Sequence, residues 1–169
     1  RYYNVFHVAT QCEGIEPKKW EDIEADTEEF EPITEAEKLI NDYKKREGLT
    51  IKEIIGDSAY YNPSMDYIQV PERKQFKDKI EFYSTLFHEL VHSTGHYSRL
   101  NRFEQGLKLA SFGSEEYSKE ELVAEIGSSC ILNELGIETK NSFNNTVAYI
   151  QSWIKVLKND SRFIISASS

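Results

Sequence analysis

Three of the four histidines in the chain lie at intervals of four residues in STLFHELVHSTGH, residues 84–96. Within it, HELVH at 88–92 has the spacing His-Glu-x-x-His. Residues four apart share one face of a helix, so His88 and His92 can point at one ion, with Glu89 beside them to hold a water bound to it. Zn²⁺ prefers two imidazoles and a carboxylate, with a fourth position open. The segment therefore predicts a zinc site, with His88 and His92 as metal ligands and Glu89 as the catalytic general base.

His96 does not complete this set of ligands. On a continuous helix, His96 and His88 would be about 12 Å apart along the axis, because each residue rises about 1.5 Å. If the chain turns at Gly95 instead, the known spacing for a third histidine requires it at position 98, which is Ser98. We therefore expect His96 to be structural or to contact a ligating residue from outside.

The better source of a third ligand is KEELVAE, residues 119–125. Glu121 and Glu125 lie one helical turn apart, so one can bind the metal while the other orients a ligating imidazole. Two other interpretations remain: Ser118 and Glu121 match a capping box, and Glu120 and Glu125 fit a solvated face. An acidic residue that faces apolar neighbours is costly unless it is paired. We favour Glu121 as the ligand and Glu125 as its outer partner, with the reverse left open.

Composition restricts the class of protein. The 169 residues suit one domain, with 39% hydrophobic and 29% charged residues and no apolar run that could span a bilayer. A net charge of −9 disfavours stand-alone binding to nucleic acid, because phosphates repel such a surface. The chain begins at Arg1, so we expect a fragment or a processed product of a longer protein.

The two cysteines, Cys12 and Cys130, are too few for a disulfide framework. A reducing compartment is favoured, and both thiols are expected to be free. Cys130 falls on the apolar stripe of an expected helix and is interpreted as a small core residue.

The spacing of apolar residues and the positions of glycine, proline and capping residues predict strands before residue 79 and mainly helices after it, which indicates an α+β fold. His7 in the first strand is expected to be structural, and 13–37 is expected to be a solvated acidic loop. Thr34 and Glu37 look like a capping box, and Gly95 and Gly136 look like helix ends. The expected elements are a strand at 2–11, a helix at 34–48, two strands in 58–71, helices at 79–95, 118–136 and 144–159, and a short helix from Ser161.

Five stretches carry a resemblance to a known family: YYNVFHVATQCEGI, AYYNPSMDYIQVPERKQF, FYSTLFHELVHSTGHYSRLNR, FGSEEYSKEELVAEIGSSCILNELGI and YIQSWIKVLKND. Together they resemble the C-terminal metallopeptidase domain of ArdC-type antirestriction proteins, also called the polyvalent-protein metallopeptidase. They keep their order over nearly the whole chain. The resemblance implies a single zincin-like domain over 1–169, with a small twisted sheet beside the active-site helix and a mostly helical C-terminal half.

The resemblance also implies a setting. Such proteins occur on plasmids, conjugative transposons and phages of bacteria, and their full-length members carry an N-terminal domain that binds single-stranded DNA. That domain is missing here, so DNA is expected as a partner only through it, with no membrane partner. The expected location is the bacterial cytoplasm, with transfer to a recipient cell during conjugation. In gluzincins and ImmA/IrrE-like proteins a helical glutamate is the third ligand, which maps to Glu121, and Glu125 follows one turn later.

The function expected from these features is zinc-dependent hydrolysis of peptide bonds in a protein or peptide substrate. Edge strands pair with extended substrates in zincins, which gives a role to the strands near 60–70. Tyr60, Tyr61, Tyr97 and Tyr117 are candidates for stabilising the oxyanion. Two alternatives stay open. One is an antirestriction module that protects DNA or blocks a host enzyme and whose zinc is only structural, and the other is an inactive regulatory metallo-domain.

Overall fold

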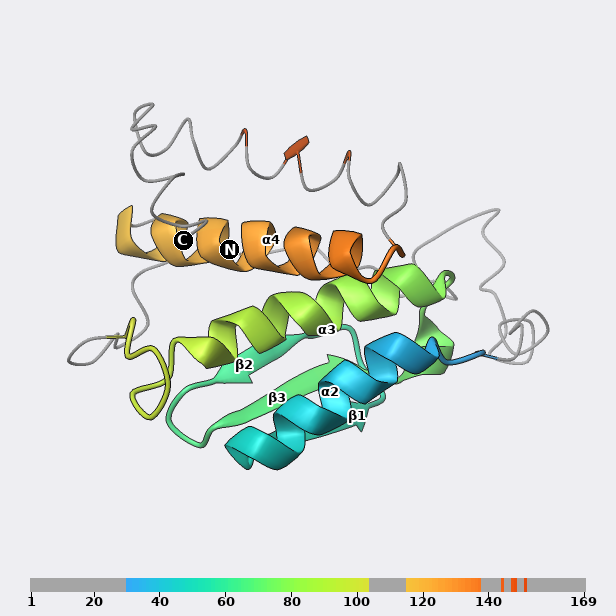
Figure 1. Ribbon diagram of the computed structural model, residues 1–169, viewed down its shortest axis with the longest axis horizontal. Helices are drawn as coiled ribbons and strands as arrows, with labels where there is room; N and C mark the ends of the chain where they lie inside the picture. Colours follow the sequence, from blue (N-terminus) through green and yellow to red (C-terminus); the bar gives the residue numbers. More distant parts are fainter. Residues whose placement is uncertain (1–29, 104–114, 138–143, 145–146, 149–150, 152–169) are drawn as a thin grey trace, which may run out of the picture.

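The computed structural model describes residues 30–103 and 115–137, together with 144, 147, 148 and 151. A small sheet and three helices form the described part (Figure 1). The elements are α2 (Thr34–Glu47), β1 (Thr50–Ile54), β2 (Tyr60–Asn62), β3 (Tyr67–Pro71), the 3-10 turn η3 (Arg73–Gln75), α3 (Lys79–Thr94) and α4 (Glu115–Glu134).

The sheet is mixed and has the strand order β1-β3-β2. β2 pairs antiparallel with β3, with Tyr61 opposite Ile68, which confirms the two strands predicted in 58–71. β1 pairs parallel with β3, from Thr50 opposite Tyr67 onward. This first strand was not predicted, because TIKEI is short and mostly exposed and its partner lies beyond a second strand. Among the described strands, β2 consequently lies at an edge of the sheet.

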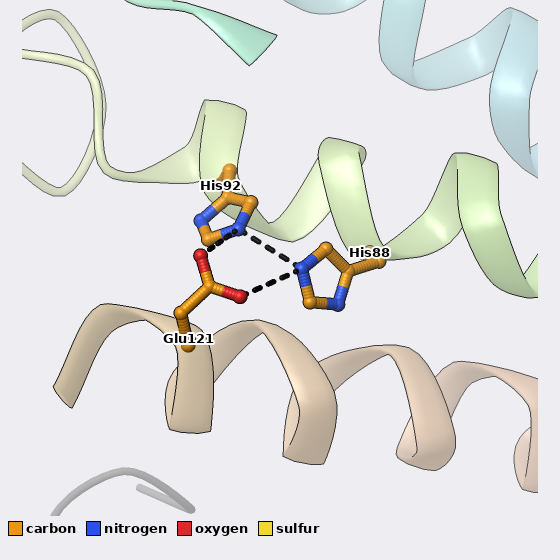
Figure 2. Close-up of side chains that lie close together, drawn as sticks. All are labelled: His88, His92 and Glu121. Atoms are coloured by element: carbon orange, nitrogen blue, oxygen red, sulfur yellow. Dashed lines mark hydrogen bonds and ion pairs between the residues drawn. The ribbon is translucent and has the colours of Figure 1, made fainter. Parts of the chain in front are cut away.

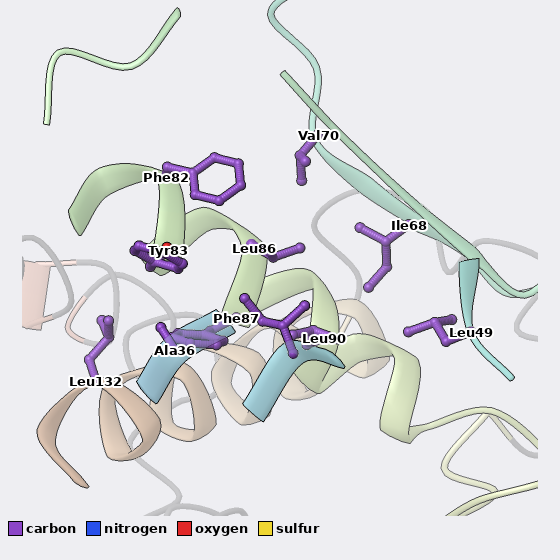
Figure 3. Packing of buried hydrophobic residues seen from close by; sticks show 11 residues of the cluster. Ala36, Leu49, Ile68, Val70, Phe82, Tyr83, Leu86, Phe87, Leu90 and Leu132 are labelled. Atoms are coloured by element: carbon purple, nitrogen blue, oxygen red, sulfur yellow. The ribbon is translucent and has the colours of Figure 1, made fainter. Parts of the chain in front are cut away.

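Helix α3 lies between the sheet and α4 (Figure 1). Its aromatic and aliphatic residues meet the buried side of β3 and residues of α2 in one hydrophobic core (Figure 3). The core residues are Ala36, Ile40, Leu49, Ile68, Val70, Phe82, Tyr83, Leu86, Phe87, Leu90 and Leu132. The helix predicted at 79–95 is therefore confirmed, as is the α+β class.

Local signals fix the ends of α2 and α3. Gly48 adopts φ +68° after the last turn of α2, a conformation that favours glycine. At the start of α3, the Asp78 side chain accepts a hydrogen bond from the Ile80 amide at 2.8 Å. Gly95 ends α3 where the ring of Phe103 approaches so closely that a Cβ atom would lie 2.7 Å from it.

The predicted capping box at the start of α2 is wrong. Ile33 is the N-cap and no side chain caps the helix, since Thr34 is already helical. Glu37 instead accepts hydrogen bonds from the Tyr83 hydroxyl, at 2.7 Å, and from the Arg73 guanidinium. A long-range contact to α3 and η3 therefore replaces the expected local cap.

Helix α4 also differs from its prediction. It begins at Glu115, three residues early, so Ser118 lies inside the helix, fully buried, and is no N-cap. Cys130 is exposed, and it has no disulfide partner among the described residues, so its assignment to the core is wrong. The buried face is made largely of small residues, because α3 approaches α4 closely and leaves little room. Its buried residues are Ser118, Leu122, Ala124, Ser128 and Leu132.

Several predictions fall outside the described residues. These are the strand at 2–11 with His7, Cys12, residues 13–29 of the acidic stretch, and the short helix from Ser161. The helix at 144–159 is described only at 144, 147, 148 and 151, which are helical. Among the described residues, none of the helices combines the length and apolar character needed to cross a bilayer.

Candidate metal centre

Helix α3 holds His88 and His92 one turn apart on the side that faces α4 (Figure 2). Their ring centroids are 4.7 Å apart. Their Nε2 atoms are only 3.1 Å apart, so both point toward the same place. The opposite side of α3 is anchored in the core through residues such as Leu86 and Leu90, which prevents the helix from rotating the imidazoles away.

Glu121 reaches the same place from α4 (Figure 2). One carboxylate oxygen lies 3.5 Å from His88 Nε2 and the other lies 3.5 Å from His92 Nε2. Donors bound to a tetrahedral ion at about 2.0–2.2 Å lie about 3.3–3.6 Å from one another. Separations of 3.1 to 3.5 Å therefore fit a divalent cation such as Zn²⁺. The three predicted ligands are the group whose donor atoms converge among the described residues, and their binding of metal stays a prediction.

The outer nitrogen of each imidazole faces a second carboxylate of α4. Glu125 Oε1 lies 3.5 Å from His88 Nδ1, and Glu120 Oε1 lies 3.1 Å from His92 Nδ1. Such contacts fix the tautomer that leaves Nε2 available to a metal. Sequence reasoning missed Glu120, which was assigned to a solvated face. Its position directly before Glu121 was the available signal.

Glu120 is also held by Arg102, which follows α3. The guanidinium donates from Nε to Glu120 Oε2 at 3.1 Å and from Nη2 to Oε1 at 2.9 Å. Burial raises the pKa of Glu120, but the hydrogen bonds from His92 and Arg102 outweigh it and keep that pKa below its usual range. Burial raises the pKa of Glu125 above its usual range. The two outer carboxylates therefore differ in their tendency to carry charge.

Glu89 lies beside this cluster and is 9% exposed. Burial raises the pKa of its carboxyl group, although the nearby imidazoles of His88 and His92 oppose this effect. The backbone amide of Tyr61 donates a hydrogen bond to the carboxylate. Tyr61 belongs to the edge strand β2, so the edge of the sheet and the predicted general base meet at one point.

Opposite charges attract the predicted ligands to one another. Burial lowers the pKa of His92, but hydrogen bonds to Glu120 and Glu121 and the charge of Glu89 raise it to about 10. Burial raises the pKa of Glu121, but His88 and His92 outweigh this and hold it far below its usual range. A cation that binds here takes the place of a proton in a site already complementary to positive charge.

The four candidate tyrosines occupy different places. Burial and the neighbouring Glu121 carboxylate raise the pKa of Tyr117, whose hydroxyl hydrogen-bonds to Glu121. Tyr60 and Tyr61 use their hydroxyls within the β2–β3 hairpin and its turn. Tyr97 is 77% exposed. Among the four, the Tyr117 hydroxyl is the one that contacts the predicted ligands.

His96 lies apart from the converging donor atoms. It is buried, its Nδ1 is 2.8 Å from Ser98 Oγ, and its ring centroid is 4.2 Å from that of Tyr97. These contacts hold the turn after α3. Whether His96 acts only structurally or also supports a ligating residue stays a prediction.

Sequence relatives place this site in a family. A profile described as zincin-like metallopeptidase matches residues 34–169. Two proteins of Escherichia coli named DNA primase TraC are 45% and 38% identical, over 74% and 95% of this chain but 8% and 14% of their own length. A protein of Sinorhizobium fredii, y4eC, is 34% identical over the whole chain and 50% of its own length. The chain thus spans half or less of the length of these relatives.

Solved structures agree with the sequence relatives. The Mn(II)-bound antirestriction protein ArdC from plasmid R388 is 37% identical, with a TM-score of 0.59, over 78% of this chain and 47% of that one. Its metal-free structure is 36% identical, also with a TM-score of 0.59, over 82% and 46% of the two chains. Profile, relatives and fold point the same way: the chain belongs to the zincin-like metallopeptidases.

Proposed function

We propose that this chain is the zinc-dependent peptidase domain of a mobile-element antirestriction protein, and that Glu89 is its general base. The observation that carries the proposal is a buried Glu89 carboxylate beside three converging donor atoms, with its Tyr61 contact on an edge strand. A site that only stabilised the fold would have no use for a buried acid that donates nothing to the metal.

The donor set supports zinc. His88, His92 and Glu121 supply two imidazoles and one carboxylate, which is a usual set for catalytic zinc. The Mn(II)-bound structure of ArdC supports a divalent cation at this site, without deciding which ion serves this chain. When bound, the cation would polarise the scissile carbonyl and make water more acidic.

Glu89 performs the proton transfers in this proposal. A carboxyl group whose pKa is raised by burial is a better base for water than an exposed one. Glu89 takes a proton from the attacking water and passes it to the leaving amine. The Tyr61 amide orients the carboxylate, which keeps the base in place between the two transfers.

The edge strand and Tyr117 complete the site. β2 is short, and its outer edge, to which no described strand pairs, can bind an extended peptide laid beside Glu89. The Tyr117 hydroxyl stands near Glu121 and Glu89 and can donate to the oxyanion that forms on the carbonyl. The substrate class is therefore an extended protein or peptide segment.

The setting is proposed by analogy. ArdC is an antirestriction protein of a plasmid, and a protein of this kind would act in the bacterial cytoplasm and, after conjugation, in a recipient cell. We assign any contact with DNA to a part of a longer protein outside this chain, because a net charge of −9 repels phosphates. Residues 1–169 would then be one metallopeptidase domain.

The test is the variant Glu89→Gln, assayed with a library of fluorescence-quenched random peptides. We expect hydrolysis to fall by at least about 10²–10⁴-fold, because the amide cannot take the proton. Zinc content and circular dichroism should be unchanged. Glu81→Gln on the exposed face of the same helix is the matched control and should retain full activity.

Two results would contradict the proposal. If Glu89→Gln cleaves peptides as fast as the wild type, Glu89 is not the base. If the zinc-loaded wild type cleaves no peptide while Glu89→Gln keeps full antirestriction activity, the non-proteolytic alternative with a structural zinc is correct.

A further inference from the structure

Glu120 and Glu121 approach the same imidazole from two sides. Glu121 Oε1 is 3.5 Å from His92 Nε2, and Glu120 Oε1 is 3.1 Å from His92 Nδ1. Consecutive residues on a helix point about 100° apart, so two neighbouring glutamates can flank one ring instead of competing for one nitrogen. The pair Glu120-Glu121 therefore determines which nitrogen of His92 faces the site.

Arg102 connects this carboxylate to the end of α3. Besides its two bonds to Glu120, its guanidinium donates to the Val91 carbonyl oxygen at 2.9 Å and to Thr94 Oγ1 at 2.7 Å. Val91 lies directly before His92 in α3. Arg102 thus joins the backbone next to His92 to the Glu120 carboxylate, which itself contacts His92.

We propose that Glu120 is a positioning residue for the metal, and that Arg102 acts through it to hold the His92 imidazole in the orientation that presents Nε2. This inference rests on the proposed metal site of His88, His92 and Glu121. It goes beyond that site because Glu120 and Arg102 donate no ligand atom to it.

The contrast between the two imidazoles supports this assignment. His92 Nδ1 lies at hydrogen-bond distance from Glu120, 3.1 Å, whereas His88 Nδ1 is 3.5 Å from Glu125. Glu120 is fixed by a two-point contact with a guanidinium, and such fork-to-fork pairs are the most directional of charged hydrogen bonds. His92 is thus the ligand with the more strongly defined orientation.

The experiment measures Zn²⁺ affinity of the whole chain by competition with a chromophoric chelator. Glu120→Gln keeps the size of the side chain but removes its charge and one of its two acceptors. We expect Zn²⁺ binding about 10–100-fold weaker, as is usual for loss of an outer partner of a ligating histidine. Arg102→Lys should weaken binding in the same direction by a smaller factor, because it loses the fork but keeps the charge.

Asp66→Asn is the matched control. The Asp66 carboxylate also accepts two hydrogen bonds from one guanidinium, that of Arg99, at 2.9 and 2.8 Å. Asp66 lies outside the converging donor atoms of the predicted metal site. Asp66→Asn should destabilise the fold to an extent similar to Glu120→Gln. It should leave Zn²⁺ affinity within about twofold of the wild type, because Asp66 contacts none of the predicted ligands. A loss of affinity in Asp66→Asn equal to that in Glu120→Gln would mean that folding alone explains both, which overturns the proposal.

A second readout is specific to the ring. In zinc-loaded protein, NMR should detect a slowly exchanging Nδ1 proton on His92, and Glu120→Gln should shift it or lose it while the His88 signal remains. Zn²⁺ affinity of Glu120→Gln within about twofold of the wild type, in folded protein, would overturn the proposal. If Glu120→Gln does not fold, Arg102→Lys decides by the same two measurements.

These outcomes separate the proposal from the function on which it rests. If the wild-type chain binds no Zn²⁺, or binds it without His88 and His92, the proposed metal site fails. If the wild type binds Zn²⁺ through them and Glu120→Gln binds it equally well, only the positioning role of Glu120 fails.

Discussion

The Tyr117 hydroxyl has two candidate roles, and one substitution can distinguish them. Its hydroxyl hydrogen-bonds to Glu121, and Glu89 lies close enough to contribute to its raised pKa. A hydroxyl there can either support the ligand Glu121 or donate to the oxyanion in the transition state. The two roles predict different kinetic results.

We predict that Tyr117→Phe lowers kcat by about 10²-fold with little change in KM, because an oxyanion donor acts mainly in the transition state. Zn²⁺ affinity should stay close to that of the wild type. Steady-state kinetics on a peptide that the wild type cleaves, together with chelator competition, provide the measurement. Weaker Zn²⁺ binding with unchanged kcat at saturating zinc would show instead that Tyr117 supports Glu121.

At the scale of elements, the close approach of α3 and α4 sets the site. Gly127 of α4 faces Val91 of α3, and a Cβ atom there would lie 2.8 Å from Val91 Cγ2. The three predicted ligands come from these two helices, so their spacing depends on this contact.

We predict that Gly127→Ala destabilises the protein by about 1–2 kcal/mol and weakens Zn²⁺ binding, because the added methyl group separates the helices. In an exposed helix the same change would stabilise by about 1 kcal/mol. Adding Val91→Ala should recover part of both losses, so the two changes should be non-additive by about 1 kcal/mol. Urea unfolding measures the effect, and a Gly127→Ala protein more stable than the wild type would refute the contact.

Elements dominated by local signals could be predicted from the sequence. The period of α3 and the turn between β2 and β3 are local, and both were located correctly. β1 could not be predicted, because Thr50–Ile54 is stabilised by parallel pairing with a strand that follows much later. Cys130 was misplaced because the burial of α4 depends on how closely α3 approaches, which the sequence of α4 alone does not contain.

The site shows the same division. The i, i+4 spacing of His88 and His92 was sufficient to predict their convergence, since a helix enforces it. Glu120 was missed because its importance arises from Arg102, which lies on another segment. Pairing across segments depends on the tertiary structure, and no spacing rule reveals it.

At the scale of the whole molecule, Arg99 joins segments far apart in the sequence. It bonds to Asp66 in the β2–β3 turn, to Glu47 at the end of α2, and to the Ser93 carbonyl of α3. Burial raises the pKa of Asp66, but hydrogen bonds from Arg99 and Tyr61 outweigh this and lower it below its usual value of 3.8.

The sign of the pH dependence follows from that direction. A carboxyl group with a depressed pKa in the folded state contributes its full stability above the unfolded-state pKa and loses it as the pH falls through the folded-state pKa. We predict that Asp66→Asn costs about 2 kcal/mol near neutral pH and that this difference shrinks below about pH 4. Urea unfolding across this range measures it, with Glu81→Gln as the control, and a difference that grows toward acid would contradict the assignment.

The central claim is that His88, His92 and Glu121 hold one divalent cation, and zinc content tests it most directly. Elemental analysis should find close to one equivalent in the wild type and in His96→Ala. Glu121→Ala and the double variant His88→Ala/His92→Ala should lose most of it. Glu125→Ala should keep zinc at saturation but bind it about 10–100-fold more weakly. If His96→Ala strips the zinc while Glu121→Ala retains it, the ligand set is wrong and the site belongs to a different class of zincin.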